Sequence, residues 1–154
     1  MVTAKGKIVR ISDEDGDGTA ESESILATIW AELPHNVDAL GVAIGARGEI
    51  FFGLGTADFT NPYLIGADGR SQYDPRGQRG TIQRLKSGAT RHEPFCSGIR
   101  FPVGLTVDPG GQLFCTDQEG ATWLPNGNPF DELLRIEEGR HYGFPLRHRL
   151  GGHA

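Results

Sequence analysis

An acidic stretch near the start of the chain has the residue types and spacing of a cation-binding loop. Between Asp13 and Glu21, the carboxylates of Asp13, Asp15 and Asp17 stand at alternate positions, and a glycine at the sixth position allows a sharp turn. The helix–loop–helix calcium template needs a bidentate glutamate at its twelfth position, which here is Ser24. Two interpretations remain open: a structural Ca²⁺ held by the three aspartates, or a solvated acidic hairpin loop.

One histidine stands out as a candidate general base. His35 follows Leu33-Pro34 and comes just before an apolar run that begins at Ala39, with Asp38 three residues further on. A histidine positioned by a neighbouring carboxylate can take a proton near neutral pH. The alternative is a histidine with a purely structural role.

Polar residues also stand where two predicted strands begin and end. Arg100 precedes Phe101-Pro102 at the entrance of a predicted strand, and the residues Asp117, Gln118, Glu119 and Gly120 close the strand that begins at Gln112. Side chains in such loop positions either contact a ligand or close turns, and both interpretations stay open.

The two cysteines, Cys96 and Cys115, are too few for a disulfide framework, and the chain has no Cys-x-x-Cys-His haem attachment motif. Buried free thiols are the default interpretation. A disulfide between them is the alternative for an exported protein.

Composition and charge exclude several classes of protein. The 154 residues include 23 Gly and 9 Pro, and the net charge is −5. No basic patch is present, which argues against nucleic acid as a partner. No apolar run approaches the ~20 residues that span a bilayer, and residues 1–18 lack the apolar core of a secretory signal.

The elements that must position these residues are short strands. Apolar runs of five or six residues are bounded by turn residues, and no apolar pattern at helical spacing persists for two turns. The sequence therefore predicts an all-β protein. The predicted strands are Lys7–Ile11, Ile25–Trp30, Ala39–Ile44, Glu49–Leu54, Thr81–Leu85, Gly104–Val107 and Gln112–Thr116.

The chain also repeats itself. Residues 40–52 align without gaps on residues 103–115, and each copy consists of a strand, a glycine turn and a strand. Residues 6–11 resemble residues 80–85, and residues 131–136 form a third opening of this kind. Such repeats are typical of β-propeller blades, with a β-sandwich as the alternative.

The repeats place two units at about 6–58 and 80–120, with a third opening near 131. We therefore expect about two blades and the start of a third. Because a closed propeller needs about four blades or more, we expect the chain to be a piece of a larger ring.

Three ordered blocks, residues 98–105, 108–120 and 131–145, resemble the quinoprotein glucose/sorbosone dehydrogenase family. The family patterns are Gly-His-Arg-Asn-Pro-x-Gly-Leu, then Ser/Thr-Glu-x-Gly-Pro, then Asp-Glu-[Leu/Ile]-Asn and Asn-Tyr-Gly-Trp-Pro. Here Phe101 replaces the Asn, and Glu119-Gly120 replaces Gly-Pro. Residues 116–145 are also similar to the membrane-bound dehydrogenase domain sub-branch.

The resemblance implies a six-bladed β-propeller that oxidises a sugar or related alcohol with pyrroloquinoline quinone (PQQ) held by Ca²⁺. It implies that His35 is the catalytic base and that Arg100 and Gln118 contact the quinone. It places the main-chain oxygens of Glu119 and Gly120 at the Ca²⁺.

The same resemblance implies a periplasmic or secreted protein with a cytochrome c as a candidate electron acceptor. We expect the 154-residue chain alone to be inactive as a dehydrogenase. The alternative function is a non-catalytic propeller that serves as a binding or scaffold module of an envelope or secreted protein.

Overall fold

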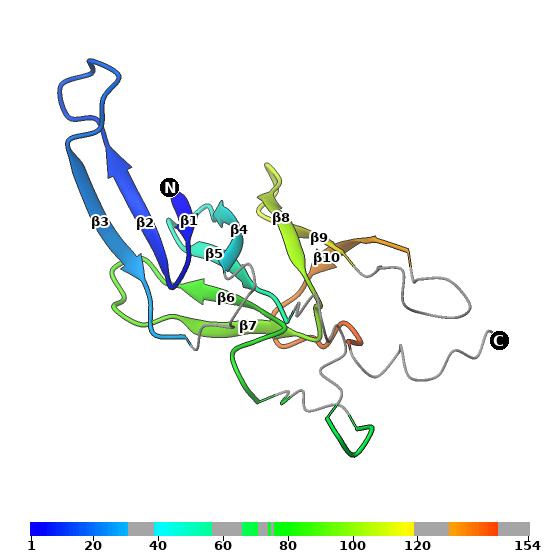
Figure 1. Ribbon diagram of the computed structural model, residues 1–154. Coiled ribbons are helices and arrows are strands. Elements are labelled where there is room, and N and C mark those ends of the chain that lie inside the picture. Colours follow the sequence, from blue (N-terminus) through cyan, green and yellow to red (C-terminus); the bar gives the residue numbers. More distant parts are fainter. Residues whose placement is uncertain (31–38, 57–65, 71–73, 75, 119–129, 145–154) are drawn as a thin grey trace.

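The computed structural model describes residues 1–30, 39–56, 66–70, 74, 76–118 and 130–144, and these residues form ten strands and no helix (Figure 1). This result confirms the predicted all-β class. The strands are β1 Val2–Ala4, β2 Lys7–Ser12, β3 Ser22–Ala27, β4 Ala39–Ile44, β5 Ile50–Leu54, β6 Thr81–Leu85, β7 Glu93–Ser97, β8 Pro102–Val107, β9 Leu113–Asp117 and β10 Glu132–Ile136.

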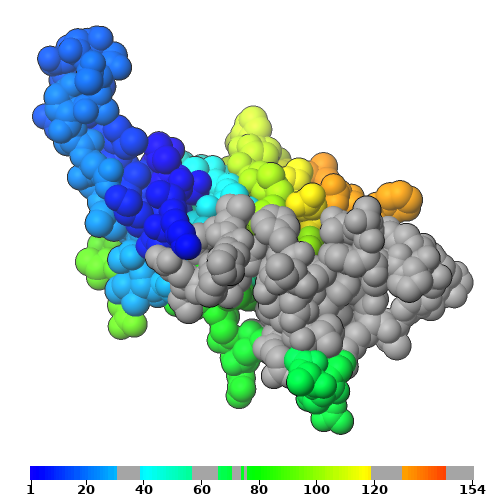
Figure 2. Space-filling model, in the orientation of Figure 1, coloured from blue at the N-terminus to red at the C-terminus, as the bar shows by residue number. Residues whose placement is uncertain are grey.

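The strands form three antiparallel sheets that follow one another along the chain. The first sheet has the order β1-β2-β3, the second β4-β5-β6-β7 and the third β8-β9-β10. In every sheet, strands that are neighbours in sequence are neighbours in space, which is the simple meander of a propeller blade. Figures 1 and 2 show the β2–β3 hairpin projecting away from the rest of the described chain.

The second sheet is covered on both faces, which explains the continuous apolar run of β5. Phe51 belongs to a core cluster shared with the third sheet, whereas the next residue, Phe52, belongs to a cluster shared with the first sheet. Successive side chains of a strand point to opposite faces, so β5 contributes to both cores. The cluster toward the first sheet contains Ile8, Ala27, Trp30, Ala39, Phe52, Leu54 and Leu85, and the cluster toward the third contains Ala43, Phe51, Ile82, Cys96, Ile99, Leu113, Cys115 and Ile136.

The two hairpins that align in sequence have the same turn. In the β4–β5 turn, the Gly45 amide donates to the Glu49 carbonyl (2.8 Å). In the β8–β9 turn, the Asp108 amide donates to the Gln112 carbonyl (3.0 Å). A glycine with positive φ occupies the fourth position of both turns, where a side chain would be strained.

A carboxylate caps each of these turns, but from opposite ends. In the first turn, Glu49 accepts a hydrogen bond from the Arg47 amide (2.9 Å). In the second, Asp108 accepts one from the Gln112 amide (2.8 Å). The two turns therefore share one backbone hydrogen-bond pattern, but the capping side chain stands at the last position of the first turn and at the first position of the second.

β4 packs closely against β8, and Gly41 makes this approach possible. A Cβ atom at Gly41 would lie 2.6 Å from Cδ1 of Leu105 and 3.1 Å from the carbonyl oxygen of Val103. Gly41 also has a φ of 54°, a conformation that favours glycine. The second and third sheets are thus joined at the strands that start each repeated hairpin.

Three rings join the first and second sheets. The rings of Trp30, Phe52 and His92 lie within 5.4–5.7 Å of one another, centroid to centroid. Nε2 of His92 lies 2.9 Å from the carbonyl oxygen of Thr28, and Nδ1 lies 2.9 Å from Oε1 of Gln83. His92 is therefore a structural histidine at a sheet boundary.

Apart from shifts of one or two residues at strand ends, the structure differs from the predicted strands in three places. The strand predicted at Ile25–Trp30 is β3, which begins at Ser22 and ends at Ala27. It ends there because Ile29 has a φ of 72°, which cannot continue a strand. The strands β1 and β7 were not predicted. β1 has only three residues, and β7 contains a proline and lies at the edge of its sheet.

Candidate functional site

Two of the predicted cofactor-binding residues meet where the second and third sheets join. Arg100 lies just before β8, and Gln118 follows the end of β9. Because β8 and β9 are antiparallel neighbours, the start of one strand and the end of the other lie side by side. The Gln118 amide donates to the Phe101 carbonyl (3.0 Å), which extends the ladder between the strands by one step.

The Arg100 side chain reaches across this junction to Gln118. Its Nη1 donates to the main-chain carbonyl oxygen of Gln118 at 2.7 Å. Arg100 is only 3% exposed, whereas Gln118 lies at the surface. The structure thus brings the two residues together as a buried guanidinium beside an exposed carboxamide.

A buried carboxylate, which the sequence analysis named among the residues that close the strand beginning at Gln112, holds the junction in place. Asp117 is 1% exposed, and its two oxygens accept hydrogen bonds from the amides of Arg100 (3.0 Å) and Phe101 (2.6 Å). A signal for this role exists in the sequence. Strand periodicity places Asp117 on the same face as Leu113 and Cys115, which are both buried.

A residue that follows β5 of the second sheet also holds Arg100 in place. Thr56, which follows β5 and is fully buried, donates from its amide (2.8 Å) and from Oγ1 (3.1 Å) to the carbonyl oxygen of Arg100. Arg100 is therefore fixed by contacts at its amide, its carbonyl and its guanidinium.

The other residues that the resemblance selects are not placed by the structure. His35, Glu119 and Gly120 lie outside the described residues. The assignment of His35 as the base, and of the main-chain oxygens of Glu119 and Gly120 as Ca²⁺ ligands, stays a prediction.

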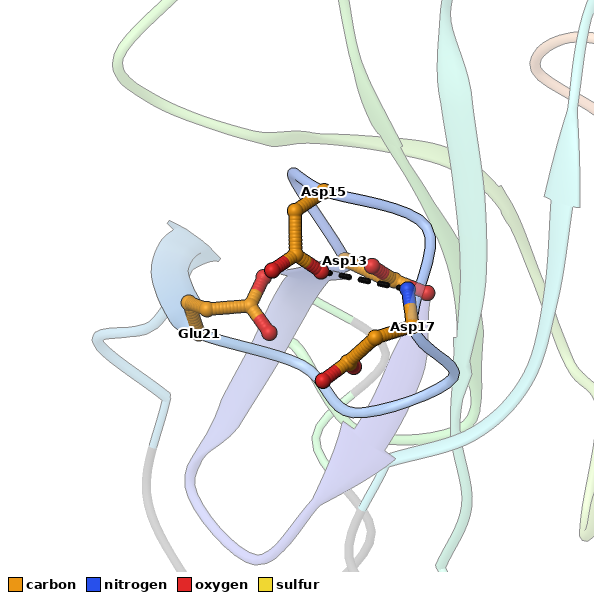
Figure 3. A group of neighbouring side chains, drawn as sticks. All are labelled: Asp13, Asp15, Asp17 and Glu21. Carbon is orange, nitrogen blue, oxygen red and sulfur yellow. Dashed lines mark hydrogen bonds between the residues drawn. The ribbon is translucent and has the colours of Figure 1, made fainter.

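The three aspartates of the acidic loop do lie together, and Glu21 joins them. One ligand oxygen from each of Asp13, Asp15, Asp17 and Glu21 lies within 4.8 Å of the others. Figure 3 shows carboxylates turning toward one another across the loop that joins β2 and β3. The sequence analysis did not assign Glu21 as a ligand, because the calcium template has its glutamate at the twelfth position of the loop, whereas Glu21 is at the ninth.

Backbone amides of the loop hold these carboxylates in place. Asp13 accepts from the amides of Gly16 (2.6 Å) and Gly18 (2.9 Å), and Asp15 accepts from the amide of Asp17 (3.1 Å). Asp17 and Glu21 each accept from one further amide of the loop, at 2.7 Å. The neighbouring Glu23 is engaged elsewhere, because it forms an ion pair with Lys7 (2.5 Å).

Both cysteines are buried free thiols, as the default interpretation predicted. Burial raises the pKa of Cys96 from 9.0 to about 12, and the nearby Asp117 carboxylate acts in the same direction. Burial likewise raises the pKa of Cys115. Since the thiolate is the reactive form, neither residue is suited to act as a nucleophile.

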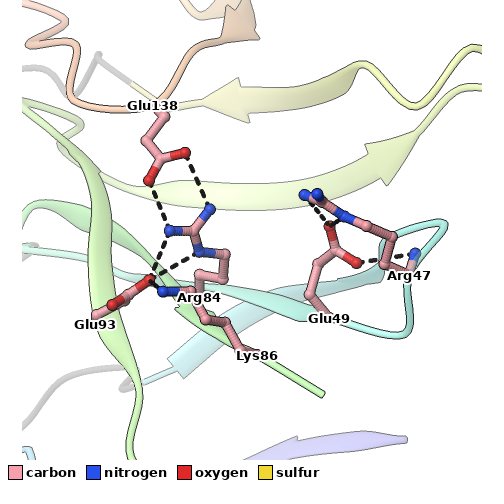
Figure 4. A network of polar contacts seen from close by, with 6 residues as sticks. All are labelled: Arg47, Glu49, Arg84, Lys86, Glu93 and Glu138. Atoms are coloured by element: carbon pink, nitrogen blue, oxygen red, sulfur yellow. Dashed lines mark hydrogen bonds and ion pairs between the residues drawn. The ribbon is translucent and has the colours of Figure 1, made fainter. Parts of the chain in front are cut away.

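An ion-pair network around Arg84 links the second sheet to the turn after β10 (Figure 4). The Arg84 guanidinium forms two hydrogen bonds with Glu138 (2.6 and 3.0 Å) and two with Glu93 (2.6 and 3.0 Å). Lys86 also pairs with Glu93, at 2.8 Å. Hydrogen bonds from Lys86 and then from Arg84 lower the pKa of Glu93, and hydrogen bonds from Glu138 raise the pKa of Arg84.

Neither a family model nor a curated protein sequence matches this chain. In the described residues, no helix is long and apolar enough to cross a membrane. Solved structures do match the fold. They include the PQQ-bound aldose sugar dehydrogenase from Streptomyces coelicolor (TM-score 0.60, 22% identity) and two glucose dehydrogenase structures (TM-scores 0.59 and 0.57, identities 21% and 22%).

Each of these matches covers 90% of this chain but only 39–40% of the matched protein. The chain thus spans about two fifths of the length of these proteins. At this level of identity the match concerns the fold. The chain folds as part of a β-propeller similar to those of sugar dehydrogenases.

Proposed function

We propose that this chain forms part of a quinone-dependent dehydrogenase that oxidises a sugar or related alcohol. The observation that carries the proposal is the pairing of Arg100 with Gln118 at a sheet junction, in a fold similar to that of a PQQ-bound sugar dehydrogenase. The resemblance to the quinoprotein family assigns both residues as quinone contacts.

The donors at this junction suit an anionic quinone. A guanidinium carries five N–H donors and matches carboxylate oxygens well. Nη1 of Arg100 donates to the Gln118 carbonyl at the junction, and a guanidinium held there is suited to attract the carboxylates of PQQ. The exposed Gln118 carboxamide offers a further N–H group to the same ligand.

In this proposal, the bound quinone supplies an electrophilic carbonyl that accepts hydride from the substrate. The chain itself supplies orientation and proton transfer. Arg100 and Gln118 hold the cofactor, and His35 takes the proton of the substrate hydroxyl. Main-chain oxygens of Glu119 and Gly120 would hold the Ca²⁺ that the quinone requires. The protein would be periplasmic or secreted and would pass electrons to a cytochrome c.

The proposal is tested in the protein that contains the complete ring, reconstituted with PQQ and Ca²⁺. We expect sugar-dependent reduction of an artificial electron acceptor that requires PQQ. His35→Ala should lower turnover by about 10²–10⁴-fold, the usual contribution of a general base, with little change in PQQ affinity.

Failure to bind PQQ would contradict the proposal and favour a non-catalytic binding module. Normal turnover in His35→Ala would remove that residue from the mechanism but leave the role of the Arg100 junction intact.

We also propose that the acidic loop holds a structural Ca²⁺. Four carboxylates with oxygens within 4.8 Å of one another repel one another unless a cation compensates them, and Ca²⁺ prefers such oxygen ligands. Calcium should therefore raise the melting temperature of the protein prepared without quinone. The double variant Asp15→Asn/Asp17→Asn should lose this rise, whereas Glu23→Gln, which removes the acid paired with Lys7, should keep it. An unchanged calcium response in the double variant would contradict the assignment.

A further inference from the structure

Asp117 is a buried carboxylate in the position that connects Arg100 with Gln118. Its backbone lies at the end of the middle strand of the third sheet, paired with Pro102 on one side and Glu132 on the other. Its side chain is 1% exposed and accepts hydrogen bonds from the consecutive amides of Arg100 and Phe101. One carboxylate therefore satisfies both backbone donors at the start of β8.

The chemistry of this contact requires a carboxylate. Buried amide groups need acceptors, and burying a charge is costly unless hydrogen bonds compensate it. A carboxylate presents two acceptor oxygens, one for each amide. An asparagine at position 117 would present one acceptor oxygen, and its NH₂ group would face a second N–H donor.

The contact acts on the Arg100 side chain through its backbone. Asp117 holds the Arg100 amide, and Thr56 of the second sheet holds the Arg100 carbonyl from the opposite side. With the backbone fixed at both ends, the guanidinium reaches the Gln118 carbonyl. An arginine that is ordered before binding loses less side-chain freedom when the ligand arrives.

We propose that Asp117 is a positioning residue for the quinone. Through the backbone of Arg100 and Phe101, it holds the Arg100 guanidinium beside Gln118 in the orientation that binds the cofactor. This inference rests on the proposed function. It adds to that function the residue that orders the site before the cofactor binds.

The test is Asp117→Asn in the protein that contains the complete ring, with two measurements. Amide hydrogen exchange at Arg100 and Phe101 should become at least about tenfold faster, because each amide then competes for a single acceptor. The dissociation constant for PQQ, measured by equilibrium titration, should rise by about 10- to 100-fold, the range seen when a residue that orients a metal-binding side chain is replaced.

A matched control exists in the same hairpin. Asp108 also caps a backbone amide, that of Gln112, but at the opposite end of β8 and β9. Asp108→Asn should change neither the exchange at Arg100 and Phe101 nor the PQQ affinity. A loss of affinity in both variants would show a general effect on stability and would overturn the positioning role.

The remaining outcomes separate this inference from the proposed function. If the parent protein binds PQQ and Asp117→Asn binds it equally well, the positioning role is overturned and the proposed function stands. If the parent protein binds no PQQ, the positioning role and the proposed function are both overturned, whatever the hydrogen-exchange rates are. If Asp117→Asn does not fold, Thr56→Val removes only the Oγ1 contact to Arg100. It should weaken PQQ binding by about 3- to 10-fold, and unchanged affinity in this variant would also overturn the proposal.

Discussion

Replacing Arg84 with methionine should destabilise the protein by loosening the second sheet from the third. The Arg84 side chain is 11% exposed and forms four hydrogen bonds with two carboxylates, one of them on the turn after β10. Its guanidinium also lies 4.9 Å from the ring centre of Phe95. Methionine keeps most of the apolar stem and removes only the charged group.

The exposure of the partners sets the size of this effect. A buried hydrogen bond to a charged group contributes about 1.5–3 kcal/mol. However, the side chains of Glu93 and Glu138 are 42% and 62% exposed and regain water when Arg84 is lost. We therefore expect Arg84→Met to lower the free energy of unfolding by about 1–2 kcal/mol, equivalent to about 2–8 °C in melting temperature.

Urea unfolding of the parent protein and its variants tests this reasoning. Arg47→Met is the matched control, because Arg47 pairs with Glu49 while its side chain is 85% exposed; it should cost less than about 0.5 kcal/mol. Added salt should shrink the Arg84 effect. Combining Arg84→Met with Glu138→Gln should cost less than the sum of the two single variants, since they share one contact. A loss no greater than that of Arg47→Met, or strict additivity, would refute the role of Arg84 in joining the sheets.

Three further predictions concern charge, thiols and packing. Hydrogen bonds from the neighbouring lysine and arginine hold the pKa of Glu93 below its ordinary 4.5. The stabilising effect of Glu93 is therefore present above pH 4.5 and is lost as the pH falls through the folded pKa. Glu93→Gln should flatten the acid side of a stability–pH profile measured by urea unfolding. Cys96 and Cys115 should resist a thiol reagent in the native protein and react rapidly in denaturant, and fast native labelling would contradict their burial. Gly41→Ala should lower the melting temperature more than Gly88→Ala, because both glycines have positive φ but only the Cβ added at Gly41 would meet atoms of another strand, at 2.6–3.2 Å.

Most strands could be predicted because each has several apolar residues between turn residues. The predictions for Ala39–Ile44 and Thr81–Leu85 match β4 and β6 in full. β7 was missed because its Glu93 and Pro94 are unusual strand residues, which the edge of a sheet tolerates. β3 was predicted too far along the chain because Ile29 has the composition of a strand residue but a backbone conformation that ends one.

The candidate site could be predicted only in part, because some of its contacts join residues that are far apart in the sequence. Arg100 and Gln118 belong to a recognisable pattern, and the strand pairing then brings them together. For Asp117 the sequence left two interpretations open, a ligand contact or a turn-closing residue, because an acidic residue at a strand end resembles an ordinary turn residue. The contact between Arg84 and Glu138 joins residues 54 positions apart, and no local pattern indicates such a pair.

In the two repeated turns, the residues at the first and last positions constrain each other. In the first turn, a Cβ atom at Gly45 would lie 2.5 Å from Cδ of Glu49, the residue whose carboxylate caps that turn. In the second turn, the capping carboxylate belongs to Asp108, and the carboxamide of Gln112 instead donates to the carbonyl of Ile136 (2.8 Å).

Exchanging these two arrangements one residue at a time carries a cost at each step. An acid added at position 45 meets the side chain of Glu49, which must then move, whereas loss of Glu49 alone removes the cap. Substitutions at the first and last positions of the turn are therefore coupled, and each costs less once the other has occurred. Related blades should consequently show paired changes at these two positions, with the acid at one end of the turn or at the other.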